Sequence, residues 1–343
     1  MNNKLGIVFD NRYLHHAIAQ PSLENPDRVR RLYLRLQQEE YYGAIAHIPP
    51  REAGHADICM VHSSFYMEQL REHAVKFDPF SYDRDTYLME ESLLTARLAA
   101  GGCLALADRI MGGGINYGFS LVRPPGHHAT AGRGMGFCIF NNVALTAEYL
   151  RRKYGLRRIL ILDFDVHHAN GTQEIFYDTS EVMVVSIHQK GIFPFTGEAD
   201  EIGVGMGAGY TINIPVHPQF GDSEYTYLLG RLLQGVVEQY LPQFILVSAG
   251  YDGHREDTIS GTLLSTQWFA TVTHLLRRHA MESCDSRLLY VMEGGYNPAA
   301  LEKSVLATID ALLRDNFERP GILAVSRAER LFDNHPLHQY WTI

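Results

Sequence analysis

Short apolar runs alternate with longer amphipathic segments along most of this chain. The short runs predict buried strands, and the longer segments predict helices that cover them. This alternation favours the α/β class, in which a central, mainly parallel sheet is flanked by helices on both faces. We expect strands at residues 5–9, 117–122, 158–164, 182–187, 210–214, 244–249 and 287–292, and helices at about 86–111, 141–154, 222–240, 265–281 and 298–314.

The stretch Asp-Phe-Asp-Val-His-His-Ala-Asn, from Asp163 to Asn170, follows one of these predicted strands. Because successive strand residues point to opposite faces, Asp163, Asp165 and His167 project to the same side. A carboxylate and an imidazole two positions apart can hold one metal ion at a strand end. This density of Asp and His therefore favours a metal site over a plain polar loop.

Three further predicted strands end in ionisable or aromatic residues. Arg-Pro-Pro-Gly-His127-His128 follows the first, Ala-Gly-Tyr-Asp252 the second and Glu-Gly-Gly-Tyr296 the third. Ligands of open α/β sheets bind outside the carboxyl ends of the strands. Several strand ends would thus bring His, Asp and Tyr to one rim, which packing alone explains poorly.

Composition narrows the class of protein. The length of 343 residues fits one large or two smaller domains, and the lack of linker-like, repetitive or low-complexity stretches favours a single domain over residues 1–343. The net charge of −9 argues against direct nucleic-acid binding and suits cationic or formerly cationic substrates. Four cysteines without a CxxC pair indicate reduced thiols and a cytoplasmic protein. No apolar run approaches the roughly 20 residues of a membrane helix.

Taken together, the motifs around His127–His128, Asp163–His168, Asp252 and Tyr296 resemble the zinc-dependent histone deacetylase and acetylpolyamine amidohydrolase superfamily. Asn-Gly-Thr-Gln173 and the Glu before the Gly-Gly pair are similar to its class II branch, including bacterial members. The resemblance implies an arginase/deacetylase-like three-layer fold. It also implies a hydrolase that removes acetyl or other acyl groups from lysine side chains of proteins or peptides.

The same resemblance implies a cofactor, one Zn²⁺ per chain, with Asp165, His167 and Asp252 as its ligands. An O/N/O set could also hold Fe(II), because ligand type alone discriminates poorly. Three protein ligands leave a position open for water and substrate, as catalytic zinc requires.

Five further residues are implied to be catalytic. His128 would be the general base, and His127 would protonate or assist the leaving amine; His suits both tasks near neutral pH. Asp163 would orient His127, and Asn170 would hold the second His without raising its pKa as far as an Asp would. Tyr296 would donate to the oxyanion.

The resemblance also assigns residues around the substrate. Gly136, Phe137 and Phe193 match the acyl-lysine channel, and Ile259 matches a gate position where polyamine-preferring members carry Glu. Phe195 stands where Gly is common and adds bulk near the mouth. A structural K⁺ is implied at Asp163, Asp165, His167, Ser186 and Ile187, and a second K⁺ at Phe176, Thr179, Val182 and Tyr210.

Three alternatives to a lysine deacetylase stay open. The first is an acetylpolyamine deacetylase, whose substrate would be a small acylated amine. The second is a dimanganese ureohydrolase, which would want Asp where Ala169 stands. The third is a reader of acylated lysine without turnover, against which the intact His pair, ligand set and Tyr296 argue. The sequence leaves the oligomeric state open, a homo-oligomer included.

Overall fold

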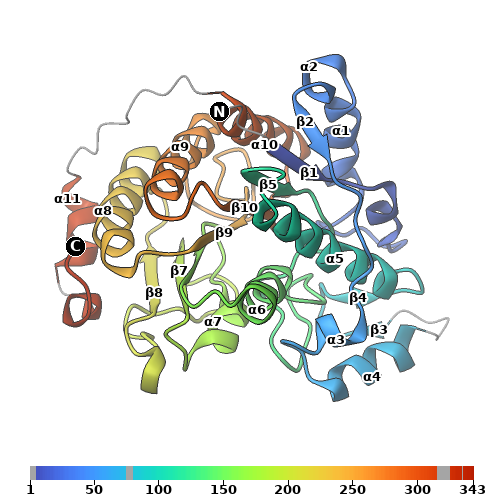
Figure 1. Ribbon diagram of the computed structural model, residues 1–343, viewed down its shortest axis with the longest axis horizontal. Helices are drawn as coiled ribbons and strands as arrows, with labels where there is room; N and C mark the ends of the chain where they lie inside the picture. Colours follow the sequence, from blue (N-terminus) through green and yellow to red (C-terminus); the bar gives the residue numbers. More distant parts are fainter. Residues whose placement is uncertain (1–4, 75–79, 315–324, 334) are drawn as a thin grey trace.

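The structure, a computed structural model, describes residues 5–74, 80–314, 325–333 and 335–343. Within these ranges one eight-stranded sheet lies between two layers of helices (Figure 1). All neighbouring strands of this sheet are parallel. The predicted α/β three-layer fold is confirmed. The strands are β1 Leu5–Val8, β2 Ile45–His47, β5 Tyr117–Ser120, β6 Ile159–Asp163, β7 Val182–Gln189, β8 Thr211–Val216, β9 Phe244–Ala249 and β10 Leu288–Met292.

The strand order across the sheet is β2-β1-β5-β10-β9-β6-β7-β8. The four strands that carry the predicted site motifs, β5, β10, β9 and β6, are therefore direct neighbours. Every residue of these four strands is buried. Strands covered on both faces read as continuous apolar runs, which is why the sequence located them well.

Helices cover the sheet in two sets (Figure 1). In one set α8 packs on α9, α9 on α10 and α10 on α1, while in the other α5 packs on α6 and α6 on α7. The helices are α1 Asp27–Leu36, α2 Glu39–Tyr42, α3 His55–Ile58, α4 Ser64–Ala74, α5 Ser92–Met111, α6 Asn142–Tyr154, α7 Asn170–Phe176, α8 Asp222–Tyr240, α9 Thr266–Ser283, α10 Pro298–Leu313 and α11 Ser326–Phe332, with 3₁₀ turns η1 Asn11–His15, η2 Gly205–Gly207 and η3 Pro336–Gln339.

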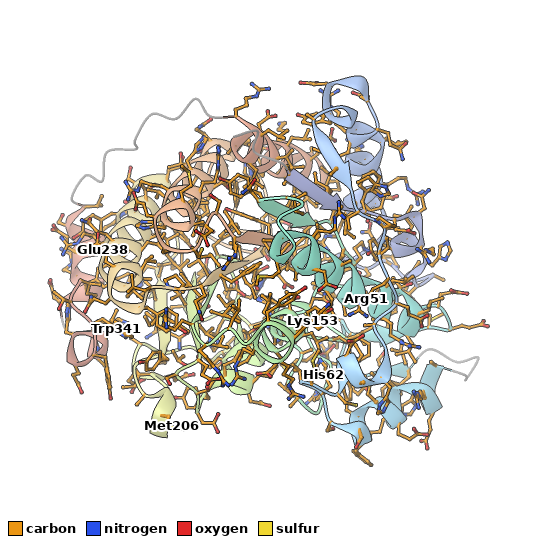
Figure 2. All side chains as sticks on the ribbon, viewed as in Figure 1. Arg51, His62, Lys153, Met206, Glu238 and Trp341 are labelled. Atoms are coloured by element: carbon orange, nitrogen blue, oxygen red, sulfur yellow. The ribbon has the colours of Figure 1, made fainter. Side chains whose placement is uncertain are left out.

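Side chains fill the space between these layers (Figure 2). An aromatic group lies directly behind the end of β6: the ring of Phe164 is 5.6 Å from Trp268 and 6.2 Å from Tyr251. Phe164 sits between Asp163 and Asp165 in the chain, so strand alternation sends its ring into the core and the two carboxylates toward the sheet edge. Core packing thus fixes the direction of the acidic residues.

One predicted helix boundary is wrong. The helix expected from residue 86 begins at Ser92, because residues 80–88 form an antiparallel hairpin of β3 Phe80–Ser81 and β4 Tyr87–Leu88. The Asp83 carboxylate accepts hydrogen bonds from the amides of Asp85 and Thr86 and so closes the turn of this hairpin. The remaining predicted elements agree with the structure to within about three residues, a typical boundary error.

A fully buried carboxylate connects the N-terminal segment to the strand ends. Glu24 accepts hydrogen bonds from Arg123 at 2.5 and 2.7 Å and from Arg28 at 3.0 Å. Arg28 also donates to the backbone carbonyls of Glu293 and Gly295, at 2.6 and 2.7 Å. Burial opposes ionisation of Glu24, yet the two guanidinium groups lower its pKa to about 2.

We expect Glu24→Gln to lower the free energy of unfolding at pH 7 by about 3–5 kcal/mol, because it leaves buried cations without their anion. The folded pKa lies below the ordinary 4.5, so the stabilisation is present above that pH and is lost as pH falls toward 2. Denaturant unfolding between pH 7 and pH 3 measures this. Glu68→Gln is the control, since its ion pair with Arg71 is exposed and 3.8 Å long, and should change stability by less than about 0.5 kcal/mol. Equal losses in both variants would contradict the expectation.

Candidate active site

The three predicted metal ligands lie together at the carboxyl ends of β6 and β9. Nδ1 of His167 is 3.0 Å from Oδ1 of Asp165 and 3.1 Å from Oδ2 of Asp252. One potential ligand atom from each residue lies within 4.8 Å of the others, and all three side chains are buried. The segment after β6 and the segment after β9 thus meet at a cluster able to hold one metal ion.

The electrostatics of this cluster suit a divalent cation. Burial and the neighbouring carboxylate of Asp165 raise the pKa of Asp252 to about 6, which reflects the cost of placing two buried anions side by side. Oδ2 of Asp252 lies 3.1 Å from Nδ1 of His167, but among the described residues it accepts no hydrogen bond of good geometry. A cation bound between the carboxylates would relieve both features, so the residues present fit a metal with an O/N/O ligand set.

Two glycines make room for these carboxylates. A Cβ atom on Gly294 would lie 2.2 Å from Oδ2 of Asp252 and 2.6 Å from Oδ2 of Asp165. A Cβ atom on Gly250 would lie 2.1 Å from the same oxygen of Asp165. The Gly294 amide also donates to that oxygen at 2.8 Å. Only a residue without a side chain allows the backbone to approach the ligands this closely.

The tandem histidines lie beside this cluster, with ring centroids 4.0 Å apart. Nδ1 of His127 is 3.0 Å from Oδ2 of Asp163, and Nδ1 of His128 is 2.7 Å from Oδ1 of Asn170. The sequence predicted both partners. Each ring is therefore oriented by a hydrogen bond at Nδ1, and its Nε2 stays available for proton transfer.

The two rings differ in charge preference. Burial opposes protonation of His127, but the carboxylates of Asp163 and Asp165 raise its pKa to about 10. Burial and the positive charges of His127 and His167 move the pKa of His128 well below its usual value. A pair of groups whose pKa values are pushed apart is the arrangement that supplies one acid and one base.

Tyr296 follows the Gly294–Gly295 pair, where Gly295 adopts a φ of +119°. Its ring lies 5.4 Å from the ring of Phe137, and the guanidinium of Arg28 lies 4.8 Å from its centroid. Burial raises the pKa of its hydroxyl well above the usual range, so the group is a neutral donor at physiological pH. This is the protonation state that an oxyanion donor requires.

The residues predicted to line the substrate channel lie near this chemistry. The ring of Phe193 packs edge-on against His128 at 5.0 Å, and a Cβ on Gly136 would meet both rings, at 2.5 and 2.8 Å. Phe137 contacts Tyr296 instead. Ile259 is half-buried, and its amide donates to Oδ1 of Asp257 at 3.3 Å.

The residues expected to bind K⁺ fall into two places. Ser186 of β7 pairs with Asp163 of β6. Ile187 follows Ser186 in the chain, and Asp165 and His167 follow Asp163. Phe176 ends α7, Thr179 and Val182 follow it, and the Tyr210 carbonyl accepts from the Val184 amide at 2.9 Å. Potassium binding at either place stays a prediction.

Two carboxylates near the site have positions that the sequence did not predict. Oε2 of the buried Glu293 accepts from the amides of Gly126 and His127, at 2.6 and 3.1 Å. Oδ2 of Asp257 accepts from the amide of Tyr296 at 2.6 Å. The Glu-Gly-Gly motif was visible in the sequence, but a contact with a backbone amide leaves no side-chain pattern to detect.

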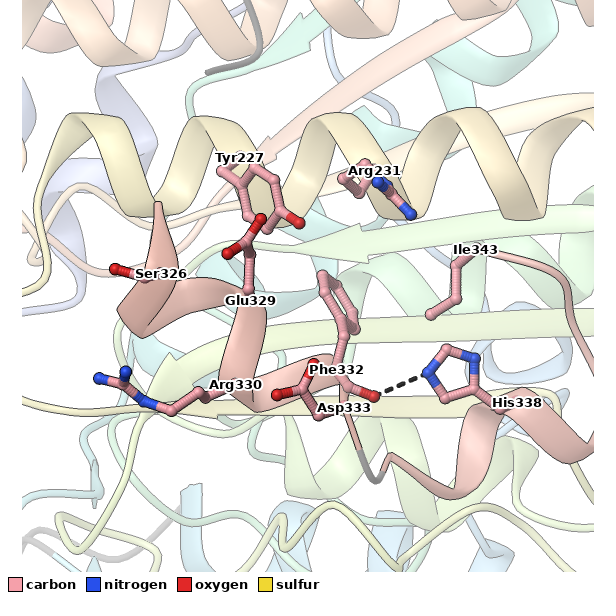
Figure 3. A pocket seen from close by; sticks show the side chains of 9 residues that line it. All are labelled: Tyr227, Arg231, Ser326, Glu329, Arg330, Phe332, Asp333, His338 and Ile343. Atoms are coloured by element: carbon pink, nitrogen blue, oxygen red, sulfur yellow. Dashed lines mark hydrogen bonds between the residues drawn. The ribbon is translucent and has the colours of Figure 1, made fainter. Parts of the chain in front are cut away.

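A separate hollow of about 390 Å³ lies between α8 and the C-terminal segment (Figure 3). Tyr227 and Arg231 of α8 face Glu329 and Phe332 of α11 there, and Nε2 of His338 bonds the Phe332 carbonyl at 2.7 Å. Its lining shares no residue with the candidate metal ligands or the histidine pair, so it is not the predicted site.

No helix in the described ranges is long and apolar enough to cross a membrane.

Comparison with known proteins extends this picture. Residues 22–312 match the histone deacetylase domain family. A probable deacetylase of Methanothermobacter thermautotrophicus is 41% identical over 298 residues, which cover 86% of this chain and 87% of the relative. A probable deacetylase of Archaeoglobus fulgidus is 37% identical over 310 residues, covering 90% and 86%. The crystal structure of the HDA15 HD domain has a TM-score of 0.91 at 32% identity, covering 99% of this chain and 96% of that one.

The fold and these relatives define the class as a hydrolase acting on amide bonds, a deacetylase. The chain belongs to the histone deacetylase family. The resemblance read from its motifs is therefore confirmed at the level of family, fold and reaction class.

We expect Gly294→Ala to weaken Zn²⁺ binding by roughly 10–100-fold, because the added methyl displaces Asp165 and Asp252 from the positions they share. Isothermal calorimetry with Zn²⁺ alone on metal-free protein measures this. The matched control is Gly132→Ala, since a Cβ there meets nothing within 4 Å and the backbone has no positive φ. Unchanged Zn²⁺ affinity in Gly294→Ala would show that the close approach is not needed for the ligand geometry.

Proposed function

We propose that this protein is a zinc-dependent amidohydrolase that removes acetyl or other acyl groups from lysine side chains of peptides or proteins. The whole chain would act as a single catalytic domain. The observation that carries the proposal is the cluster of Asp165, His167 and Asp252 beside two histidines with opposite charge preferences. The four cysteines are free, which supports a reducing compartment such as the cytoplasm.

Asp165, His167 and Asp252 would hold one Zn²⁺, which when bound supplies Lewis-acid polarisation of the acyl carbonyl and activation of water. Two carboxylates give the cluster the negative charge that a divalent cation neutralises. The buried position excludes bulk water and strengthens every charge interaction in the site.

The histidine pair would divide the proton transfers. His128 is neutral and can accept the proton of the attacking water at Nε2, because Asn170 occupies its Nδ1. His127 is positively charged next to Asp163 and can give a proton to the departing amine. Both tasks need groups within hydrogen-bond reach and with the correct protonation state at neutral pH.

Tyr296 would donate its hydroxyl to the oxygen that gains negative charge in the transition state. Phe137 and Phe193 would flank the methylene chain of the acylated lysine, since their rings pack against Tyr296 and His128 respectively. An apolar channel loses little when the neutral chain excludes water from it. K⁺ bound at the ends of β6 and β7 would hold the Asp163–His167 segment rigid.

The favoured substrate is a peptide rather than a polyamine. Ile259 places no negative charge in the loop after Asp252, and Phe195 is 76% exposed. Charged secondary amines of a polyamine would find no carboxylate at Ile259, whereas apolar peptide surface would find apolar side chains. Ala169 is buried where a dimanganese ureohydrolase would want an Asp ligand, so that alternative has no support here.

We expect Tyr296→Phe to lower kcat on an acetyl-lysine peptide by roughly 10²–10³-fold, because it removes one oxyanion donor. The zinc content should not change, because Tyr296 is no ligand. A continuous assay and metal analysis of the same preparation measure both. Tyr340→Phe, which removes an exposed hydroxyl elsewhere, is the control. A Tyr296→Phe enzyme with wild-type kcat would assign that hydroxyl a purely structural role.

We expect wild-type kcat/KM to be higher for acetyl-lysine peptides than for N-acetylated putrescine or spermidine. Ile259→Glu should narrow or reverse this preference, because a carboxylate there attracts the charged amines of the polyamine. Ile259→Gln, which is polar but uncharged, separates charge from loss of apolar contact. A wild-type enzyme that already prefers acetylated polyamines would instead support acetylpolyamine deacetylation.

A further inference from the structure

Asp257 lies in the loop that follows Asp252, and among the described residues its carboxylate accepts hydrogen bonds from backbone amides alone. Asp257 is 6% exposed. Its Oδ2 accepts from the amides of Tyr296 at 2.6 Å and Asn297 at 3.0 Å, and its Oδ1 accepts from the amide of Ile259 at 3.3 Å. The carboxylate of Asp257 therefore joins the backbone of Ile259 to the backbone of Tyr296, the residue proposed as oxyanion donor.

The backbone on either side of Tyr296 explains why this contact matters. Gly294 and Gly295 precede it, and Gly295 adopts a φ of +119°, so the chain enters Tyr296 through a turn with little intrinsic stiffness. Asn297 follows and caps α10, with Oδ1 accepting from Ala299 at 3.1 Å. Arg28 holds the carbonyl of Gly295 on one side, and the hydrogen bond from the Tyr296 amide to Asp257 holds the backbone at Tyr296 itself.

The loop itself is anchored near the metal cluster. Oγ of Ser260 donates to the carbonyl of Asp252 at 2.9 Å, and the amide of Asp257 donates to the carbonyl of His254 at 2.8 Å. Nδ2 of Asn297 donates to the carbonyl of Glu256 at 2.7 Å, which adds a second tie between the loop and the Tyr296 turn. The loop is therefore connected to the Tyr296 turn at two points, and of these Asp257 is the one bonded to the amide of Tyr296 itself.

We propose that Asp257 is a positioning residue for the hydrolysis, which aims the Tyr296 hydroxyl and couples it to the loop that carries Ile259. The inference rests on the proposed function above, in which Tyr296 stabilises the oxyanion. Asp257 does not touch the substrate; it acts through the backbone amide of Tyr296. A substrate that moves the Ile259 loop would thereby change the alignment of the donor.

Asp257→Ala should lower kcat on the acetyl-lysine peptide by roughly 10–100-fold with little change in KM, since a small misplacement of a catalytic group has an effect of this size. Zinc content should stay at the wild-type level. Asp257→Asn keeps the size and one acceptor oxygen, so it should restore most of kcat. If the Asp257→Ala protein does not fold, kcat is measured on Asp257→Asn instead. Glu256→Gln is the control, because the side chain of Glu256 is exposed and its one ion pair among the described residues, with Lys303, is 3.9 Å long.

A double-mutant cycle with Tyr296→Phe separates positioning from general destabilisation. If Asp257 acts through the hydroxyl of Tyr296, adding Asp257→Ala to Tyr296→Phe lowers kcat by less than about threefold, far short of the roughly 10–100-fold expected for the single variant. Losses that multiply, or an Asp257→Ala enzyme with wild-type kcat, would overturn the proposal.

Hydrogen–deuterium exchange of the peptide covering residues 293–300 tests the same link without any turnover. The amides of Tyr296 and Asn297 should exchange faster in Asp257→Ala than in the wild type or in Glu256→Gln. If the wild type fails to hydrolyse acyl-lysine, the proposed function fails, while faster exchange still supports the positioning contact. Unchanged exchange would refute the contact whatever the activity.

Discussion

Four carboxylates buried at one edge of a parallel sheet are the feature to which the rest of this structure is adapted. Asp163, Asp165, Asp252 and Glu293 are each 1% exposed or less. Removing one such charge from water costs several kcal/mol unless partners compensate. The strand order that places β5, β10, β9 and β6 side by side supplies those partners, because it brings imidazoles and backbone amides to the same edge.

The two tandem histidines prefer different charge states because their surroundings differ. Both rings are buried, and both are held through Nδ1. The carboxylates of Asp163 and Asp165 stabilise His127 as a cation, whereas burial and the positive charges of His127 and His167 keep His128 uncharged. In the proposed mechanism, this difference lets His128 accept a proton from water and His127 give one to the departing amine.

The outer layer of the site is held through backbone groups more than through side-chain pairs. Glu293 fixes the amides that precede the histidine pair, and Asp257 fixes the amide of Tyr296. Arg28 holds two carbonyls of the Glu293–Gly295 turn and is itself held by Glu24. In the proposed function, contacts of this kind would orient the reactive groups without entering the chemistry.

The fold class could be predicted from the pattern of apolar runs, and so could the meeting of most site residues at one edge of the sheet. Continuous apolar runs mark strands buried on both faces, and parallel strands end on the same side, so polar motifs after those runs must meet. The start of α5 was misplaced, because the turn at Asp83 creates a hairpin that no apolar period reveals.

The contacts of Glu293 and Asp257 could be seen in the folded chain alone. These carboxylates meet backbone amides 166 and 39 residues away in the chain. Every residue other than proline offers such an amide, so the sequence around the partner carries no sign of the contact. The close approach of Gly250 and Gly294 to the ligands was equally hidden, because a glycine at a turn looks the same whether or not a carboxylate lies against it.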